Sequence, residues 1–186
     1  MKSRPQAVAV GVGILALAAA ILLAMGRNPW IESGTIKLWT SDAWGPENSQ
    51  QVLDPYSFTH VMHGALLYAL LRYAARYRSP QQRGLLTLAL ESAWEIFENT
   101  DMVINRYRAA TLALGYYGDS VLNSVGDILM CSLGFLVAAR LPARVTVLAM
   151  IGLELVLLLW IRDNLSLNLL MLVYPVAAIK AWQLGH

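Results

Sequence analysis

Long apolar runs separated by short polar segments form the dominant pattern of this chain. A transmembrane helix needs about 20 mostly apolar residues, since each residue adds about 1.5 Å to a helix. Six segments approach this length: residues 7–26, 57–77, 84–101, 119–139, 145–161 and 166–183. The pattern therefore predicts an all-α fold, a polytopic membrane helical bundle of about six transmembrane helices that forms one domain over residues 1–186.

Two longer polar segments, residues 27–56 and 102–118, are predicted to be loops on the same, outer side of the membrane. The first contains three tryptophans, which favour the bilayer interface, so this loop is expected to cover the bundle at the membrane surface. The first apolar run follows two basic residues, as a signal peptide does, but it exceeds the usual apolar core of about 7–15 residues. It is interpreted as a retained helix. In the last helix, Pro175 predicts a kink because proline lacks an N–H.

Composition and charge agree with a membrane protein. The chain is 57% hydrophobic and 14% charged, whereas soluble domains average about 45–50% and about 25%. Lysine and arginine concentrate on the cytoplasmic side of such proteins. With six spans and the N-terminus inside, nine of the fourteen basic residues fall on the inner side: Lys2, Arg4, Arg72, Arg76, Arg78, Arg83, Arg140, Arg144 and Lys180. This bias predicts a bacterial inner-membrane protein with both termini in the cytoplasm. The net charge of +2 gives no reason to expect a nucleic-acid partner.

Three polar patches, at residues 57–64, 91–99 and 118–127, interrupt the apolar segments. Ionisable groups within a bilayer cost several kcal/mol each unless they are paired or reach water, so they usually mark function. Topology places all three patches in the outer half of the bundle. The predicted cavity has a mouth of His60, Glu98 and Asp119, a middle layer of His63, Glu95 and Asn123, and a floor of Glu91 and Asp127.

Several kinds of chemistry suit such a cavity. A histidine beside carboxylates can act as a general base, and a carboxyl that stays protonated can act as an acid. Two histidines and nearby carboxylates can also hold a divalent cation, and the candidate ligands are His60, His63, Glu95, Glu98 and Asp119. Helix N-termini at the mouth, together with Arg106 and Arg108, could bind a lipid-linked or other amphipathic anionic substrate.

Each of these residues also has a purely structural interpretation. The histidines and glutamates could form a hydrogen-bonded seam between helices, and Asp119 could be a helix N-cap. The alternative function is therefore a non-enzymatic accessory subunit of a larger membrane complex. Ion or proton translocation is a third hypothesis. The sequence contains no Gly-x-Ser-x-Gly elbow, His-Glu-x-x-His motif or phosphate loop that would identify a reaction.

The patches resemble the VanZ-like group of bacterial membrane proteins, including its YjdF-like branch. The matching residues, within positions 54–135, are His60, Glu91, Trp94, Glu95, Asp119, Asn123 and Gly126.

The whole chain more closely resembles an uncharacterised bacterial family of multi-pass inner-membrane proteins. That similarity rests on the runs Asp-Pro-Tyr-Ser-Phe-Thr-His-x-x-His-Gly, Glu-x-x-Trp-Glu-x-x-Glu-Asn and Gly-Asp-Ser-x-x-Asn-Ser-x-Gly-Asp. It implies a polytopic helical inner-membrane protein and, for VanZ-like members, a role in the cell envelope or in glycopeptide resistance. The expected partner of the predicted cavity is membrane lipid. It supplies no established reaction. VanZ-like proteins usually carry an arginine shortly before the aspartate, whereas Arg108 stands eleven residues earlier.

Overall fold

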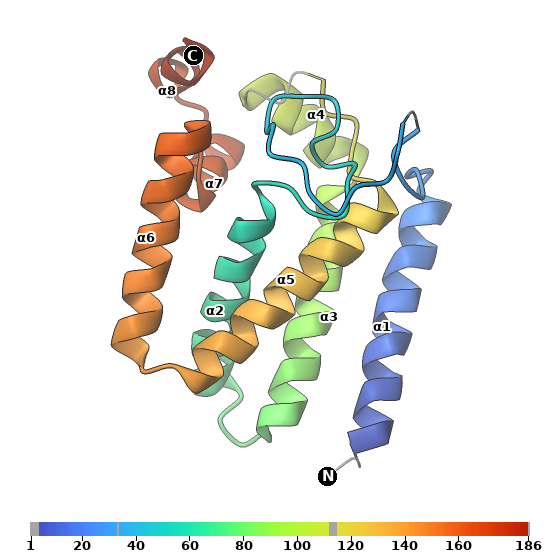
Figure 1. Ribbon diagram of the computed structural model, residues 1–186. Helices are drawn as coiled ribbons and strands as arrows, with labels where there is room; N and C mark the ends of the chain where they lie inside the picture. The colour runs from blue at the N-terminus through green and yellow to red at the C-terminus, as the bar shows by residue number, and fades with distance from the viewer. Residues whose placement is uncertain (1–3, 33, 112–114, 186) are drawn as a thin grey trace.

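The fold is a helical bundle, seen in a computed structural model that describes residues 4–32, 34–111 and 115–185 (Figure 1). Those residues form eight α-helices and no strand, which confirms the all-α prediction. Three of the helices, α1, α5 and α6, are long and apolar enough to cross a membrane. The helices are α1 (Arg4–Ala24), α2 (Ser57–Ala74), α3 (Pro80–Glu98), α4 (Asp101–Ala110), α5 (Val121–Arg140), α6 (Ala143–Ile161), α7 (Leu165–Val173) and α8 (Ala177–Leu184).

The closest crossing in the bundle is between α2 and α5, which run over one another at its centre (Figure 1). Gly64 on α2 and Gly134 on α5 form this crossing. A Cβ atom on Gly64 would lie 2.6 Å from the amide nitrogen of Phe135 and closer still to the carbonyl oxygen of Cys131. Glycine is therefore needed because it lets the two backbones touch, as small residues do where transmembrane helices cross. α3 packs beside this pair, and α1 and α6 lie on opposite flanks.

Side-chain caps define where the two central polar helices begin. α3 starts at Pro80, earlier than predicted, because Ser79 forms a capping box. The Ser79 hydroxyl accepts from the amide of Gln82 at 3.2 Å, and the Gln82 side chain accepts from the amide of Ser79 at 3.0 Å. α5 is capped by Ser120, which accepts from the amide of Asn123, so the N-cap suggested for Asp119 was wrong by one residue.

The last apolar segment is not one helix. It forms two helices, α7 with nine residues and α8 with eight, and Pro175 lies between them, where a kink was predicted. Each is far shorter than the roughly 20 residues that a bilayer requires. Lys180 of α8 donates to the carbonyl of Ala109 on α4, so Lys180 lies at the opposite end of the bundle from the start of α1 (Figure 1). The prediction that put both ends of the chain on one side does not match this arrangement.

Both predicted loops contain ordered structure. Residues 102–118 include most of α4. Residues 27–56 fold over one end of the bundle and reach down to α5, where the carbonyl oxygen of Val52 occupies the space that a side chain on Gly126 would need (Figure 1). The side chain of Asn123 donates to the carbonyl of Gln51 at 3.0 Å. α2 therefore begins beneath this segment rather than at the outer surface.

Candidate functional site

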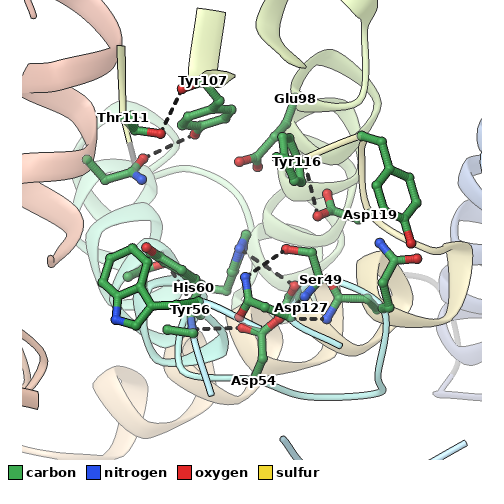
Figure 2. A pocket seen from close by; sticks show the side chains of 18 of the residues that line it. Ser49, Asp54, Tyr56, His60, Glu98, Tyr107, Thr111, Tyr116, Asp119 and Asp127 are labelled. Carbon is green, nitrogen blue, oxygen red and sulfur yellow. Dashed lines mark hydrogen bonds and ion pairs between the residues drawn. The ribbon is translucent and has the colours of Figure 1, made fainter. Parts of the chain in front are cut away.

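A cavity of about 390 Å³ lies between the covering segment 27–56 and the helices α2 to α5 and α7 (Figure 2). It is of the size that binds small molecules in proteins, about 300–1,000 Å³. Six of the eight predicted catalytic residues line it: His60, His63, Glu98, Asp119, Asn123 and Asp127. The other two, Glu91 and Glu95, are buried beside it. The structure thus brings the three polar patches together.

Two histidines share one carboxylate oxygen. Nδ1 of His60 lies 2.6 Å from Oε1 of Glu91, and Nδ1 of His63 lies 2.9 Å from the same oxygen. Because an ionised carboxylate only accepts hydrogen bonds, both Nδ1 atoms carry protons and donate. In the neutral rings this leaves the lone pair on Nε2, the state in which imidazole accepts a proton. The arrangement fits a base held in one tautomer.

His60 is surrounded by carboxylates from two helices. Besides Glu91, its ring lies 3.3 Å from Oε1 of Glu95 and 3.8 Å from Oδ2 of Asp127. The other oxygen of Asp127 accepts from the hydroxyl of Ser57 at 2.6 Å. No hydrogen-bond partner for Oε1 of Glu95 is found in the part of the chain that the structure describes. The centre of the site is therefore one imidazole among three buried carboxylates.

The predicted depth order was wrong for His60. It was placed at the mouth with Glu98 and Asp119, yet it contacts the two predicted floor residues, Glu91 and Asp127. The cause is the covering segment, which fills this end of the bundle and contacts α5. α2 begins beneath that segment, so His60 lies deeper than it would if α2 began at the outer surface of the bundle.

Asp119 belongs to a separate, paired cluster. Asn99, at the end of α3, donates to Oδ2 of Asp119 at 2.7 Å and accepts from its backbone amide at 2.7 Å. The hydroxyl of Tyr116 donates to the second carboxylate oxygen at 3.0 Å (Figure 2). Burial raises the pKa of Asp119, and these hydrogen bonds oppose that rise. Asn99 was not among the predicted site residues, although it is the last residue of the polar patch 91–99.

Asp54 was also missed, because it stands in a segment that was predicted to be a surface loop. Its carboxylate accepts from the amides of Ser49 and Tyr56, each at 2.8 Å, and from the side chain of Asn123 at 3.3 Å. Burial raises the pKa of Asp54 despite these bonds. The signal that could have found it was the run Asp-Pro-Tyr-Ser-Phe-Thr-His, which places Asp54 six residues before His60.

The two predicted anion-binding arginines do not line the cavity. Arg106 donates to the carbonyls of Leu172 and Val173 at the end of α7, at 2.6 and 3.0 Å. Arg108 donates to the carbonyl of Tyr116. Among the described lining residues there is no lysine or arginine, whereas four carboxylates are present, so the wall is acidic.

Asp163 lies outside the cavity, in the turn between α6 and α7, and is hydrogen-bonded to one residue of the cavity wall. It accepts from the hydroxyl of Tyr56, a lining residue, at 3.0 Å. Burial raises the pKa of Asp163 from 3.8 to about 6. The folded state therefore binds a proton more tightly than the unfolded state, and stability falls as pH rises from about 4 to about 6.

Asp163→Asn is expected to remove this dependence. The charged carboxylate costs about 3 kcal/mol above pH 6, by the size of the shift. The wild type should accordingly gain thermal stability relative to the variant when pH falls from about 7.5 to about 5. Thermal unfolding in detergent at both pH values measures this difference. An equal difference at the two pH values would contradict the expectation.

Comparison with known proteins identifies the relatives of this chain. Residues 22–185 match the model of a protein family described as a protein of unknown function, DUF2585. The chain belongs to this family. It is 48% identical to a UPF0314 protein of Sphingopyxis alaskensis over 176 residues, which cover 95% of this chain and 94% of the relative. It is 50% identical to a UPF0314 protein of Rhizobium meliloti over 174 residues, covering 94% and 88%.

These relatives confirm the expectation of an uncharacterised bacterial family. Their names do not mention VanZ, so the more distant VanZ-like relationship stays a prediction. No solved structure matches the chain. The argument for function therefore rests on the geometry of the cavity.

Proposed function

We propose that the chain is an inner-membrane protein whose bundle crosses the bilayer with five helices, α1, α2, α3, α5 and α6. The charges at the two ends of the bundle support this topology. One end of the bundle contains the start of α1, the connection between α2 and α3, and the connection between α5 and α6 (Figure 1). It carries seven described basic residues: Arg4, Arg72, Arg76, Arg78, Arg83, Arg140 and Arg144. No Asp or Glu in the described residues lies at that end. By the positive-inside rule, this end faces the cytoplasm, and the cavity and α8 face the opposite, periplasmic side.

The cavity, in this proposal, binds the polar head of an amphipathic molecule taken from the membrane. One observation carries the argument. His63 and Trp94 line both the polar cavity and a second, mainly apolar groove of about 280 Å³ between α2 and α3. Leu66 and Leu90, which also line the groove, are 48% and 45% exposed on the lipid-facing side of the helices. The cavity and the groove therefore adjoin at His63 and Trp94, which supports a head group in the cavity with its alkyl chain in the groove.

The histidines give this cavity a chemical capacity beyond binding. With Nδ1 donating to Glu91, Nε2 of His63 can accept a proton from a water or a hydroxyl group of the bound head. Glu98 lines the same cavity and offers a carboxylate to the head group or to a bound cation. Asp119 and Asn123, by contrast, are engaged with Asn99, Asp54 and the covering segment, which supports a structural role for these two residues.

Blocking the groove tests the proposal. Leu66→Trp fills the groove between α2 and α3, whereas the control Leu148→Trp adds the same side chain to a 68% exposed position on α6. The proteins are delipidated in detergent, incubated with a total bacterial phospholipid extract, and analysed by native mass spectrometry. We expect the wild type and Leu148→Trp to retain a bound lipid and Leu66→Trp to lose most of it. Equal retention by both variants would exclude the groove as the route of the chain.

A further inference from the structure

We propose that His60, Glu95 and Glu98 form a binding site for a divalent metal ion. This deepens the function proposed above, because a bound cation would supply the positive charge that a phosphorylated head group needs in an acidic cavity. One ring nitrogen of His60 and one carboxylate oxygen from each glutamate lie within 4.8 Å of one another. Ligand atoms around a shared ion stand about 3–4 Å apart, so small rotations of the carboxylates close the site.

Glu95 provides the observation that distinguishes this cluster from a chance gathering of polar groups. Its side chain is 1% exposed, and its Oε1 atom has no hydrogen-bond partner in the described parts of the chain. The ring nitrogen 3.3 Å away, Nδ1 of His60, already donates to Glu91. A buried carboxylate oxygen is normally hydrogen-bonded, paired with a cation or coordinated to a metal. Oε1 of Glu95 can therefore coordinate an ion without first giving up a hydrogen bond.

The second cluster of possible ligands is less suited to an ion. It consists of His60, His63 and Glu91. Oε1 of Glu91 accepts from both histidines, at 2.6 and 2.9 Å, so these contacts are already satisfied by hydrogen bonds. A carboxylate that orients a histidine ring is the usual support behind a metal ligand. Glu91 is therefore assigned this positioning role for His60.

The surroundings and the donor set indicate which ion would bind. Asp127 lies 3.8 Å from His60 and adds a further negative charge, while the described lining residues include no lysine or arginine to compete with a cation. Figure 2 shows the carboxylate of Glu98 pointing into the cavity, where a ligand could reach a bound ion. One imidazole nitrogen with two carboxylate oxygens is a mixed set that suits Zn²⁺ or Mn²⁺.

Metal binding by the whole protein tests the site. The protein is purified in detergent with a chelator, freed of the chelator, and incubated with Zn²⁺ or Mn²⁺ before mass spectrometric metal analysis. We expect one ion per chain in the wild type. Glu95→Gln should bind at least about tenfold more weakly, because losing a ligand should cost no less than the roughly 10–100-fold that follows the loss of a residue supporting a ligand. Asp163→Asn, which removes a buried carboxylate outside the cavity, is the matched control and should bind as the wild type does.

Thermal unfolding keeps the test valid if a variant is unstable. An ion that binds only the folded state raises the unfolding temperature, so Zn²⁺ should stabilise the wild type and Asp163→Asn but neither Glu95→Gln nor Glu98→Gln. The proposal fails if the stripped wild type takes up neither ion, or if both glutamate variants bind it as the wild type does. Lipid retention without metal uptake would overturn the metal site alone. Metal uptake with unchanged lipid retention in Leu66→Trp would overturn only the lipid-binding function.

Discussion

Replacing Gly64 by alanine is expected to prevent folding of the bundle, whereas the same replacement at Gly152 is expected to be neutral or slightly stabilising. The added methyl group on Gly64 would meet the backbone of α5, 2.6 Å from the nitrogen of Phe135. Overpacking typically costs about 1–3 kcal/mol. The cost here should exceed that range, because a backbone cannot move aside as a side-chain rotamer does.

Gly152 offers the matched control. It also lies within a long apolar helix, α6, but a Cβ atom there would have no neighbour within 4 Å. Alanine favours a helix by up to about 1 kcal/mol over glycine. Thermal unfolding of both variants in the same detergent measures the contrast. A Gly64→Ala protein as stable as the wild type would show that α2 and α5 do not cross as closely as described.

The second large effect is expected at Asn99. Asn99→Asp would place a second carboxylate against Asp119, whose Oδ2 atom lies 2.7 Å from the Asn99 side-chain nitrogen. Two buried like charges without compensation destabilise a fold by several kcal/mol, and we expect a loss of about 3–5 kcal/mol near pH 8. The new carboxylate favours its neutral form in the folded state. The loss should therefore shrink as pH falls toward about 5.

Asn28→Asp is the control for this change. Asn28 donates to Glu32 at 3.1 Å, so the substitution also sets two carboxylates side by side, but in an exposed position. Exposed charge pairs are worth only about 0–1 kcal/mol because water screens them. Chemical or thermal unfolding at the two pH values measures both variants. Similar losses for the two would show that the Asn99 cluster is open to water.

The sequence predicted which polar residues meet, but not how deep they lie. Helical spacing places Glu91, Glu95 and Glu98 on one face of α3, and that face does turn toward the histidines. Depth depended on where α2 begins, and this is set by contacts between residues 27–56 and α5 that no local periodicity encodes. The pairs Asn99–Asp119 and Asp54–Asn123 could not be predicted for the same reason. The first joins residues 20 positions apart and the second joins residues 69 positions apart.

The end of the chain shows a second limit of prediction. Pro175 marked the break between α7 and α8 correctly. The direction of the chain after the break follows instead from tertiary hydrogen bonds. Lys180 donates to Ala109, and Gln183 donates to the carbonyl of Arg162 at 2.9 Å. Hydropathy alone cannot distinguish two short helices held in this way from one kinked span.

The covering segment has a consequence for the order in which the protein is assembled. Its buried groups find their partners on a part of the chain that the ribosome makes later: the carbonyl of Gln51 pairs with Asn123, 72 positions downstream, and that of Ser49 with the amide of Ser120. Backbone polar groups cannot be left unpaired in hydrocarbon. In the membrane topology proposed above, residues 49–54 must therefore stay in contact with water until α5 emerges, and α2 must stay above its final depth. We expect the site around His60 to form only after α5 has been inserted, as a late step of biogenesis.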